Sequence, residues 1–262
     1  MGDELTIATT PSERHRQTLE LLFAALPTSE RVAQMATTMA AVRSGRLSLE
    51  GLLEAQRGDA TVGVVWASVM GGRAALVWPA QLAAGEREET VASLYAQLAS
   101  WMHERDVQVA NAFLADDHSA DARRLTAAGF TRVAEILYLV SEQATFPDAQ
   151  VATPLQFEVF SEAEQDRLAE IIERTYEGTL DCPALDGQRD IADVIQGYQE
   201  TGVYNPSRWF FVRHDDADIG CLLLADHPAE NQWELIYQGI IKTNRKLSIT
   251  QSSLKCAKRV LD

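Results

Sequence analysis

Apolar residues in the first half of the chain recur with two different periods, which predicts helices and strands in a definite order. The run Leu5 to Ala8 predicts a short strand. Apolar positions three and four apart then predict two helices, the second of which closes at Ser44-Gly45. From Leu52 to Trp78 the pattern becomes β-rich, and it is interrupted by turn signals at Gly58-Asp59 and Gly71-Gly72. This stretch predicts an antiparallel meander of three strands.

A second group of elements follows the meander. A long helix is predicted from about Glu86 to Arg105, because acidic residues begin it and apolar residues form one face. A buried strand, Val107 to Leu114, and a short helix, Ser119 to Ala128, are expected next. The runs Phe130 to Val133 and Ile136 to Val140 are rich in β-forming residues and predict the last strands of this half. The order βααβββαβαβ favours a mixed sheet with helices on both faces.

The same order of elements begins again after residues 141–153, which are polar and aperiodic. Leu155 to Phe160 predicts a strand, and Ser161 to Glu164 forms a capping box for the helix that follows. A further helix is expected within Gly187 to Thr201, and three β-rich runs then end with Trp233 to Ile241. The succession β-α-α-β-β-β therefore occurs twice.

A short sequence repeat coincides with this repeated order. Gly58 to Gly63 resembles Asp215 to Gly220, and each begins the middle strand of a meander. The period of roughly 157 residues indicates duplicated domains rather than a solenoid. We therefore predict an α/β fold with two tandem domains, residues 1–145 and 154–262, each a twisted mixed sheet flanked by helices.

Composition and charge exclude several classes of protein. The 262 residues carry a net charge of −15, which disfavours binding to nucleic acid and to anionic membrane surfaces. No long apolar run and no leader-like beginning is present in the sequence, so we expect a cytoplasmic protein with no membrane partner. Cys182, Cys221 and Cys256 lack the spacing of zinc ligands or of a disulfide framework, and no metal site is expected.

Several motifs within this order of elements resemble the GCN5-related N-acetyltransferases. Arg123 to Phe130 is similar to the helix of that family that ends in Gly-Phe. In the second half the resemblance lies in Ile219-Gly220 and in Leu235 to Ile241. It implies an acyl-CoA-dependent N-acetyltransferase with tandem domains, which uses acetyl-CoA as co-substrate and a small-molecule or peptide amine as acceptor.

In this family the turn between the third meander strand and the long helix holds acyl-CoA, because backbone N–H groups there approach the pyrophosphate. The first half offers Gln81, Ala84 and Gly85 in this turn. Glu86 and Glu88 add negative charge at the same place, which would weaken pyrophosphate binding. The turn of the first half is therefore interpreted as a degenerate acyl-CoA site. In structural terms it is then an ordinary start of a helix.

The corresponding turn of the second half is basic. The resemblance assigns acetyl-CoA binding to the end of the strand and to the turn after it, namely to Gly239, Ile240, Ile241, Arg245, Lys246, Leu247 and Ser248. Arg245 fits the family pattern, whereas Lys246 and Ser248 stand where it has glycines. Their Cβ atoms would crowd a backbone that must approach phosphate closely. The alternative is a solvated basic helix start.

Two residues on the strand before this turn are the catalytic candidates. If the second half is catalytic, Glu234 is expected to accept the amine proton, and Tyr237 is expected to donate a proton to the leaving thiolate. Both also have structural interpretations. Glu234 can be a solvent-facing strand residue, and Tyr237 can be a packing residue.

The second domain is expected to be incomplete. Leu247 to Leu261 can form the long helix, but no residues remain for the strand, helix and strand pair that close the first copy. Either another chain supplies the missing strands, as in a homodimer, or a sheet edge stays open, or the sequence is a shortened or altered version of a longer protein. Two functions remain open: an N-acetyltransferase with a catalytic second domain, and a catalytically silent tandem protein used for binding or assembly.

Overall fold

A computed structural model describes residues 4–142, 155–178 and 187–244 of the chain. The chain divides into two compact units, residues 1–132 (unit 1) and residues 133–262 (unit 2). The boundary predicted between residues 145 and 154 lies wholly outside the described residues. The predicted domains 1–145 and 154–262 therefore stay a prediction.

Unit 1 is built on a five-stranded sheet in the order β1-β2-β3-β4-β5, in which only β4 and β5 run parallel. Its strands are β1 (Leu5–Thr9), β2 (Leu52–Arg57), β3 (Ala60–Met70), β4 (Ala74–Leu82) and β5 (Val109–Asn111). Its helices are α1 (His15–Leu22), α2 (Thr28–Arg43), α3 (Glu89–His103) and α4 (Ala120–Ala127). The predicted α/β class is confirmed, and so is the mixed sheet of the first half.

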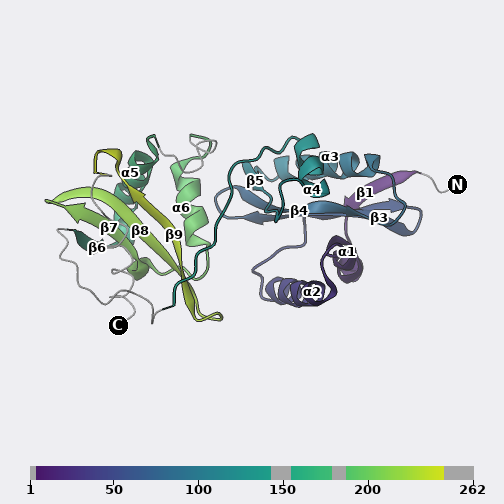
Figure 1. Ribbon diagram of the computed structural model, residues 1–262, viewed down its shortest axis with the longest axis horizontal. Coiled ribbons are helices and arrows are strands. Elements are labelled where there is room, and N and C mark those ends of the chain that lie inside the picture. The colour runs from purple at the N-terminus through teal and green to yellow at the C-terminus, as the bar shows by residue number, and fades with distance from the viewer. Residues whose placement is uncertain (1–3, 143–154, 179–186, 245–262) are drawn as a thin grey trace. The chain divides into compact units, whose positions relative to one another are not determined.

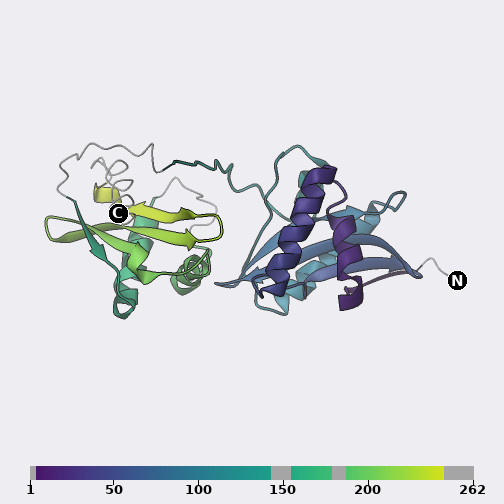
Figure 2. The same ribbon diagram turned by 90° about the horizontal axis from the view of Figure 1, so that it is seen from below.

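Helices cover both faces of this sheet (Figure 1). On one face, α3 and α4 pack on a core that includes Val65, Leu94 and Leu98. On the other face, α1 and α2 lie side by side, as Figure 2 shows, and they cover Trp66 and Trp78. The rings of these two tryptophans are stacked, with centroids 3.8 Å apart. The strands of the meander are therefore buried on both sides, which explains their nearly continuous apolar sequence.

Unit 2 contains a four-stranded antiparallel sheet in the order β6-β7-β8-β9. Its strands are β6 (Gln156–Val159), β7 (Trp209–His214), β8 (Ala217–His227) and β9 (Gln232–Ile240). The helices α5 (Gln165–Tyr176) and α6 (Ile191–Gln199) pack on the face that carries Trp209, Phe211 and Leu223. On the opposite face, Phe210, Val212 and Leu222 belong to a second apolar cluster.

An ion network fixes the start of α5 on the sheet of unit 2. Arg167 of α5 donates to Asp218 of β8 over 2.7 and 2.8 Å and to Glu158 of β6 over 2.6 Å. Its guanidinium also lies 3.9 Å from the centroid of the Phe211 ring. Hydrogen bonds from Arg167 hold the pKa of both carboxyl groups below their ordinary values. This network joins the neighbouring elements β6 and α5 to β8, which lies about fifty residues further along the chain.

The strands predicted at the end of the first half are wrong. The structure gives neither Phe130 to Val133 nor Ile136 to Val140 any helix or strand. Leu139 and Val140 are 90% and 89% exposed. The residue types suit a strand, but a strand also needs an edge with which its backbone can pair, and composition does not supply one. The strand predicted from Val107 to Leu114 is likewise reduced to β5.

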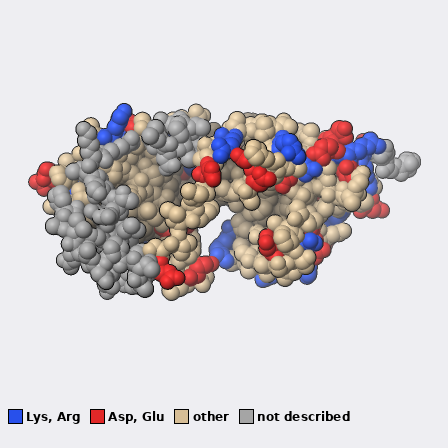
Figure 3. Space-filling model, in the orientation of Figure 1, with Lys and Arg blue, Asp and Glu red and all other residues tan. Residues whose placement is uncertain are grey.

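The surface of unit 1 carries both signs of charge. In Figure 3, the Arg side chains of unit 1 lie among Asp and Glu side chains rather than in a single basic patch on this face. Among the described residues, no helix is both long and apolar enough to cross a membrane.

Candidate functional site

The candidate residues Glu234 and Tyr237 lie on the same face of the unit 2 sheet. Glu234 is opposite Ala225 of β8, and Tyr237 is opposite Leu223. Because Ala225 and Leu223 are two residues apart, their side chains point to one face, and so do those of their partners. The register shifts between Leu223 and Leu224, which leaves Ile236 as an extra residue in β9. Simple alternation would have separated the two side chains, and this bulge brings them to the face covered by α5 and α6.

Tyr237 belongs to a polar cluster beneath α5 and α6. Its hydroxyl lies 2.5 Å from Oγ1 of Thr175, and Thr175 in turn donates to the carbonyl of Ile172 over 2.6 Å. A threonine hydroxyl has a single proton, so Tyr237 is the donor in its bond to Thr175. The Tyr237 ring stacks on Tyr198, whose hydroxyl is 2.8 Å from that of Tyr176. Burial raises the pKa of Tyr198 far above its ordinary value.

Glu234 lies near the turn that joins β8 to β9. Its side chain is 48% exposed, and its Oε2 atom is 2.9 Å from Nε2 of His227. His227 is on β8 and packs against Gly202, where an added Cβ would lie 3.0 Å from the ring. The carboxylate is therefore both accessible to solvent and within hydrogen-bond distance of an imidazole nitrogen.

The residues predicted to bind acetyl-CoA are described only in part. Gly239 is buried, and an added Cβ would lie 2.6 Å from Oγ1 of Thr175 and 2.7 Å from the Tyr237 hydroxyl oxygen. Ile240 packs in the apolar cluster on the opposite face, and the backbone N–H of Ile241 donates to the Ile219 carbonyl over 2.8 Å. The remaining predicted residues lie outside the described part of the chain: Arg245, Lys246, Leu247 and Ser248. Their assignment stays a prediction.

Sequence reasoning missed Thr175, Tyr176, Tyr198 and His227. Thr175 and Tyr176 lie at the end of α5, more than sixty residues before Tyr237, with which they are in contact. No local pattern marks such a long-range cluster. The one usable signal was the density of tyrosines in the second half, since a buried tyrosine needs a hydrogen-bond partner.

The turn after β4 in unit 1 does not fit acetyl-CoA. Gln81 donates to both carboxylate oxygens of Asp121 over 3.3 Å, so its amide is already bound. Glu86 accepts from Arg57 over 3.1 and 3.2 Å and from Thr90 over 2.7 Å, which lowers the pKa of Glu86 to about 2. The polar side chains Gln81 and Glu86 at this turn are therefore already bound to other side chains of unit 1.

Comparison with known proteins supports this description of the fold. No protein-family model and no curated protein matches the sequence. Among solved structures, a GCN5-related N-acetyltransferase from Sphaerobacter thermophilus matches over 97% of this chain and 83% of its own, with 11% identity and a TM-score of 0.51. The chain therefore has the fold of the GCN5-related N-acetyltransferases.

Two further structures are similar at lower TM-scores. The aminoglycoside N-acetyltransferase AAC(6')-Iy, solved in complex with CoA, is 14% identical over 54% of this chain and 97% of its own, with a TM-score of 0.44. A GCN5-related N-acetyltransferase from Kribbella flavida is 12% identical over 98% of this chain, with a TM-score of 0.41. This chain spans 61% of the length of the Kribbella flavida protein.

Within residues 4–142, 155–178 and 187–244, no group of three or more His, Cys, Asp or Glu side chains is placed to hold a metal ion.

Proposed function

We propose that the chain is an acyl-CoA-dependent N-acetyltransferase that acts on a small-molecule or peptide amine, and that unit 2 performs the reaction. The single observation that carries this proposal is the bulge at Ile236, which brings Glu234 and Tyr237 to one face of β9. The fold, shared with N-acetyltransferases, supports the reaction class by analogy alone.

The proposed reaction is the transfer of an acetyl group to an amine, with Glu234 as the general base. Acetyl-CoA supplies an acetyl group activated as a thioester. The amine nitrogen forms a bond to the acetyl carbon while the carbon–sulfur bond breaks, and Glu234 accepts the proton that the nitrogen loses. The exposure of Glu234 and its hydrogen bond to His227 support this role, because the proton can pass to the imidazole and then to water.

Tyr237 is proposed as the group that donates to the leaving thiolate. Its proton is directed at Thr175 in the structure, so its hydroxyl must rotate away from Thr175 before it can donate to sulfur. Thr175 then holds the hydroxyl between reaction cycles. Gly239, Ile240 and Ile241, together with residues 245–248, are proposed to hold the cofactor.

The test is a steady-state assay of thiol release from acetyl-CoA with a panel of primary amines. Wild type should release CoA in the presence of at least one amine, and Glu234→Gln should lower kcat about 10²- to 10⁴-fold. Glu230→Gln changes the same charge in the nearby turn and should leave kcat unchanged. Thermal unfolding with acetyl-CoA should show a higher midpoint than unfolding without it, because a ligand of the folded state stabilises that state. A chain that neither turns over acetyl-CoA nor gains stability from it is not an acetyltransferase.

We also propose that the chain consists of two tandem domains, residues 1–145 and 154–262, which are copies of one domain plan. Each unit has a backbone bond that ties the residue after its first strand to the start of its second, from Thr10 to Leu52 and from Phe160 to Trp209, both over 2.8 Å. Each has a register shift in the first meander pair, after Ala55 and after Val212, which are equivalent in a repeat of roughly 157 residues.

The second candidate function is a catalytically silent tandem protein used for binding or assembly. The occupied turn of unit 1 favours it, because Gln81 and Glu86 there are bound to other side chains. A homodimer and a cytoplasmic location are proposed with either function, the latter on the acidic composition.

A further inference from the structure

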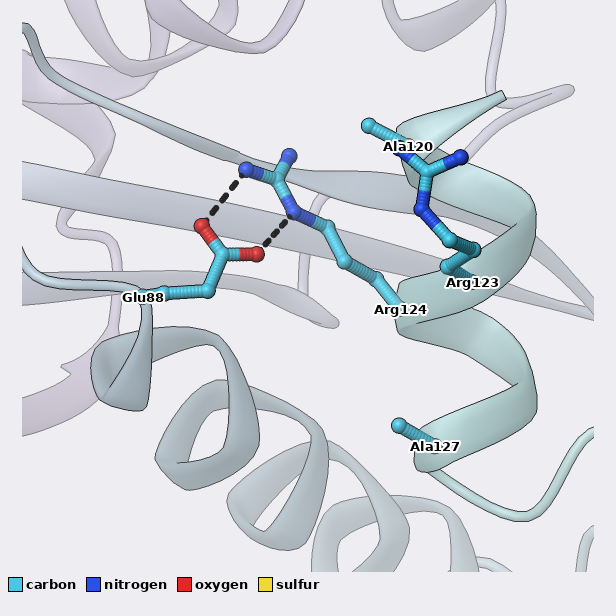
Figure 4. A pocket seen from close by; sticks show the side chains of 5 residues that line it. All are labelled: Glu88, Ala120, Arg123, Arg124 and Ala127. Carbon is cyan, nitrogen blue, oxygen red and sulfur yellow. Dashed lines mark hydrogen bonds and ion pairs between the residues drawn. The ribbon is translucent and has the colours of Figure 1, made fainter. Parts of the chain in front are cut away.

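A salt bridge borders the cavity between the start of α3 and the helix α4 in unit 1 (Figure 4). The guanidinium of Arg124 donates from Nε and Nη2 to the two carboxylate oxygens of Glu88 over 2.5 and 2.9 Å. The cavity has a volume of about 390 Å³ and is lined by Glu88, Ala120, Arg123, Arg124 and Ala127. Its two arginines come from α4, and its one carboxylate comes from the turn before α3.

The guanidinium of Arg124 is occupied on every nitrogen. Nε and Nη2 bind Glu88, while Nη1 approaches Asp121 over 3.4 Å and the carbonyl of Ala80 over 3.5 Å. Only about a fifth of the Arg124 side chain is exposed. Hydrogen bonds from Arg124 hold the pKa of Glu88 below its ordinary value, so the carboxylate stays charged across the neutral range.

The neighbouring acidic residue shows the same arrangement. Glu86, two residues earlier, is held by the guanidinium of Arg57 on β2 over 3.1 and 3.2 Å. The two carboxylates at this turn are thus each bound by an arginine from a different element of unit 1. A planar guanidinium fork binds carboxylate and phosphate with the same geometry. Each carboxylate therefore satisfies the donors that a phosphate group would otherwise use.

We propose that Glu88 is an internal anion that occupies Arg124 and closes the cavity between α3 and α4 of unit 1 to acetyl-CoA and other phosphate-bearing ligands. A phosphate that entered would have to displace Glu88 and would then lie beside an unpaired carboxylate. The fold family implies a cofactor at this turn, and the side chains of unit 1 oppose it. This inference goes beyond the proposed function, which concerns unit 2.

Because the Glu88 carboxylate occupies Nε and Nη2 of Arg124, one substitution at Glu88 should open the cavity to phosphate. Arg123 also lines the cavity, and its Nη1 donates to the carbonyl of His118 over 2.8 Å. Without the Glu88 carboxylate, the cavity would hold two guanidinium groups on α4, with Asp121 as the nearest acidic partner of Arg124. Such a pair is suited to a pyrophosphate, because each arginine can bind one phosphate group.

The experiment measures inorganic pyrophosphate binding by the full chain through the ¹H–¹⁵N resonances of arginine Nε. The chains compared are wild type, Glu88→Ala, Glu89→Ala and Glu88→Ala/Arg124→Ala. We expect Glu88→Ala to shift the Arg124 resonance saturably, with an affinity at least tenfold above that of wild type. Glu89→Ala removes the same charge from a side chain that does not line the cavity, and it should behave like wild type. In the double variant, the Arg123 resonance should no longer respond.

Three results would overturn the proposal. The first is saturable binding at Arg124 in wild type, the second is no gain in Glu88→Ala, and the third is an equal gain in Glu89→Ala. Thermal unfolding checks that each variant keeps its fold, which the exposed position of Glu88 favours. Acetyl-CoA turnover plays no part in this measurement. A wild-type chain that fails to transfer acetyl groups would count against the proposed function and would leave this inference standing.

Discussion

Gly220 of β8 packs directly on the backbone of Gly239 of β9, since an added Cβ at position 220 would lie 2.1 Å from the Gly239 carbonyl oxygen. That oxygen is a backbone atom and cannot move without breaking the strand pairing. We expect Gly220→Ala to destabilise unit 2 by about 3 kcal/mol or more, because overpacking against backbone cannot relax. Hydrogen exchange of the β8 amides, followed by mass spectrometry, measures this loss.

Gly63 of β3 is the matched control for Gly220. An added Cβ at position 63 would lie 3.0 Å from the side-chain ends of Leu82 and Leu94, which can shift by a few tenths of an ångström, and in ordinary contact with the Cβ of Ala55 at 3.5 Å. Gly63→Ala should therefore cost about 1 kcal/mol in the exchange of β3 amides. If both substitutions cost the same, the close approach at Gly220 is not what limits the sheet of unit 2.

The stability of unit 1 should depend on pH partly through Glu86. Its pKa is lowered from 4.5 to about 2 by the hydrogen bond to Arg57, so the folded state binds this proton less readily than the unfolded state does. The stabilisation is therefore complete above about pH 5 and is lost as the pH falls through about 2. Urea unfolding should show that Glu86→Gln is less stable than wild type at pH 6 and that the two converge near pH 2. If the difference in stability between wild type and Glu86→Gln were the same at both pH values, the lowered pKa of Glu86 would be contradicted. The control is Glu89→Gln, which removes a neighbouring charge.

Cys221 should be unreactive in the folded protein. The thiol is completely buried in β8, and burial raises its pKa to about 12. We expect no labelling of the Cys221 peptide by a maleimide at pH 8 until urea unfolds the chain, as measured by mass spectrometry of the digested protein. Labelling of this peptide under native conditions, at the rate seen in urea, would mean that β8 is open.

The exposed apolar run Ile136 to Val140 should favour self-association without contributing to stability. Leu137 is 77% exposed and Leu139 is 90% exposed. Leu137→Lys/Leu139→Lys should therefore change the free energy of unfolding by less than about 0.5 kcal/mol per site. Sedimentation velocity should show a lower average mass for the variant than for wild type at high concentration, because exposed apolar patches promote association. A fall in thermal midpoint would show instead that these side chains are packed.

The catalytic candidates show what a strand pattern can and cannot predict. The sequence predicted one strand that carries both Glu234 and Tyr237, from the residue types and the turn that follows. The structure confirms this strand as β9. Their common face depends on the extra residue Ile236, which is a property of pairing with β8 and not of β9 alone. The neighbours of Tyr237, namely Thr175 and Tyr198, come from helices that no local signal connects to this strand.

The sequence by itself determined those helices and strands whose buried face shows in the spacing of their apolar residues. The apolar faces of α3 and α5 and the runs of β3 and β8 were predicted because each side chain pattern matches one regular structure. Tertiary structure alone decided which polar side chains meet. Glu88 binds Arg124 and Tyr237 binds Thr175 because loops and helices bring distant segments within 3 Å. It also decided that Ile136 to Val140 forms no strand, because a strand is stabilised by an edge that pairs with it as well as by its own residues.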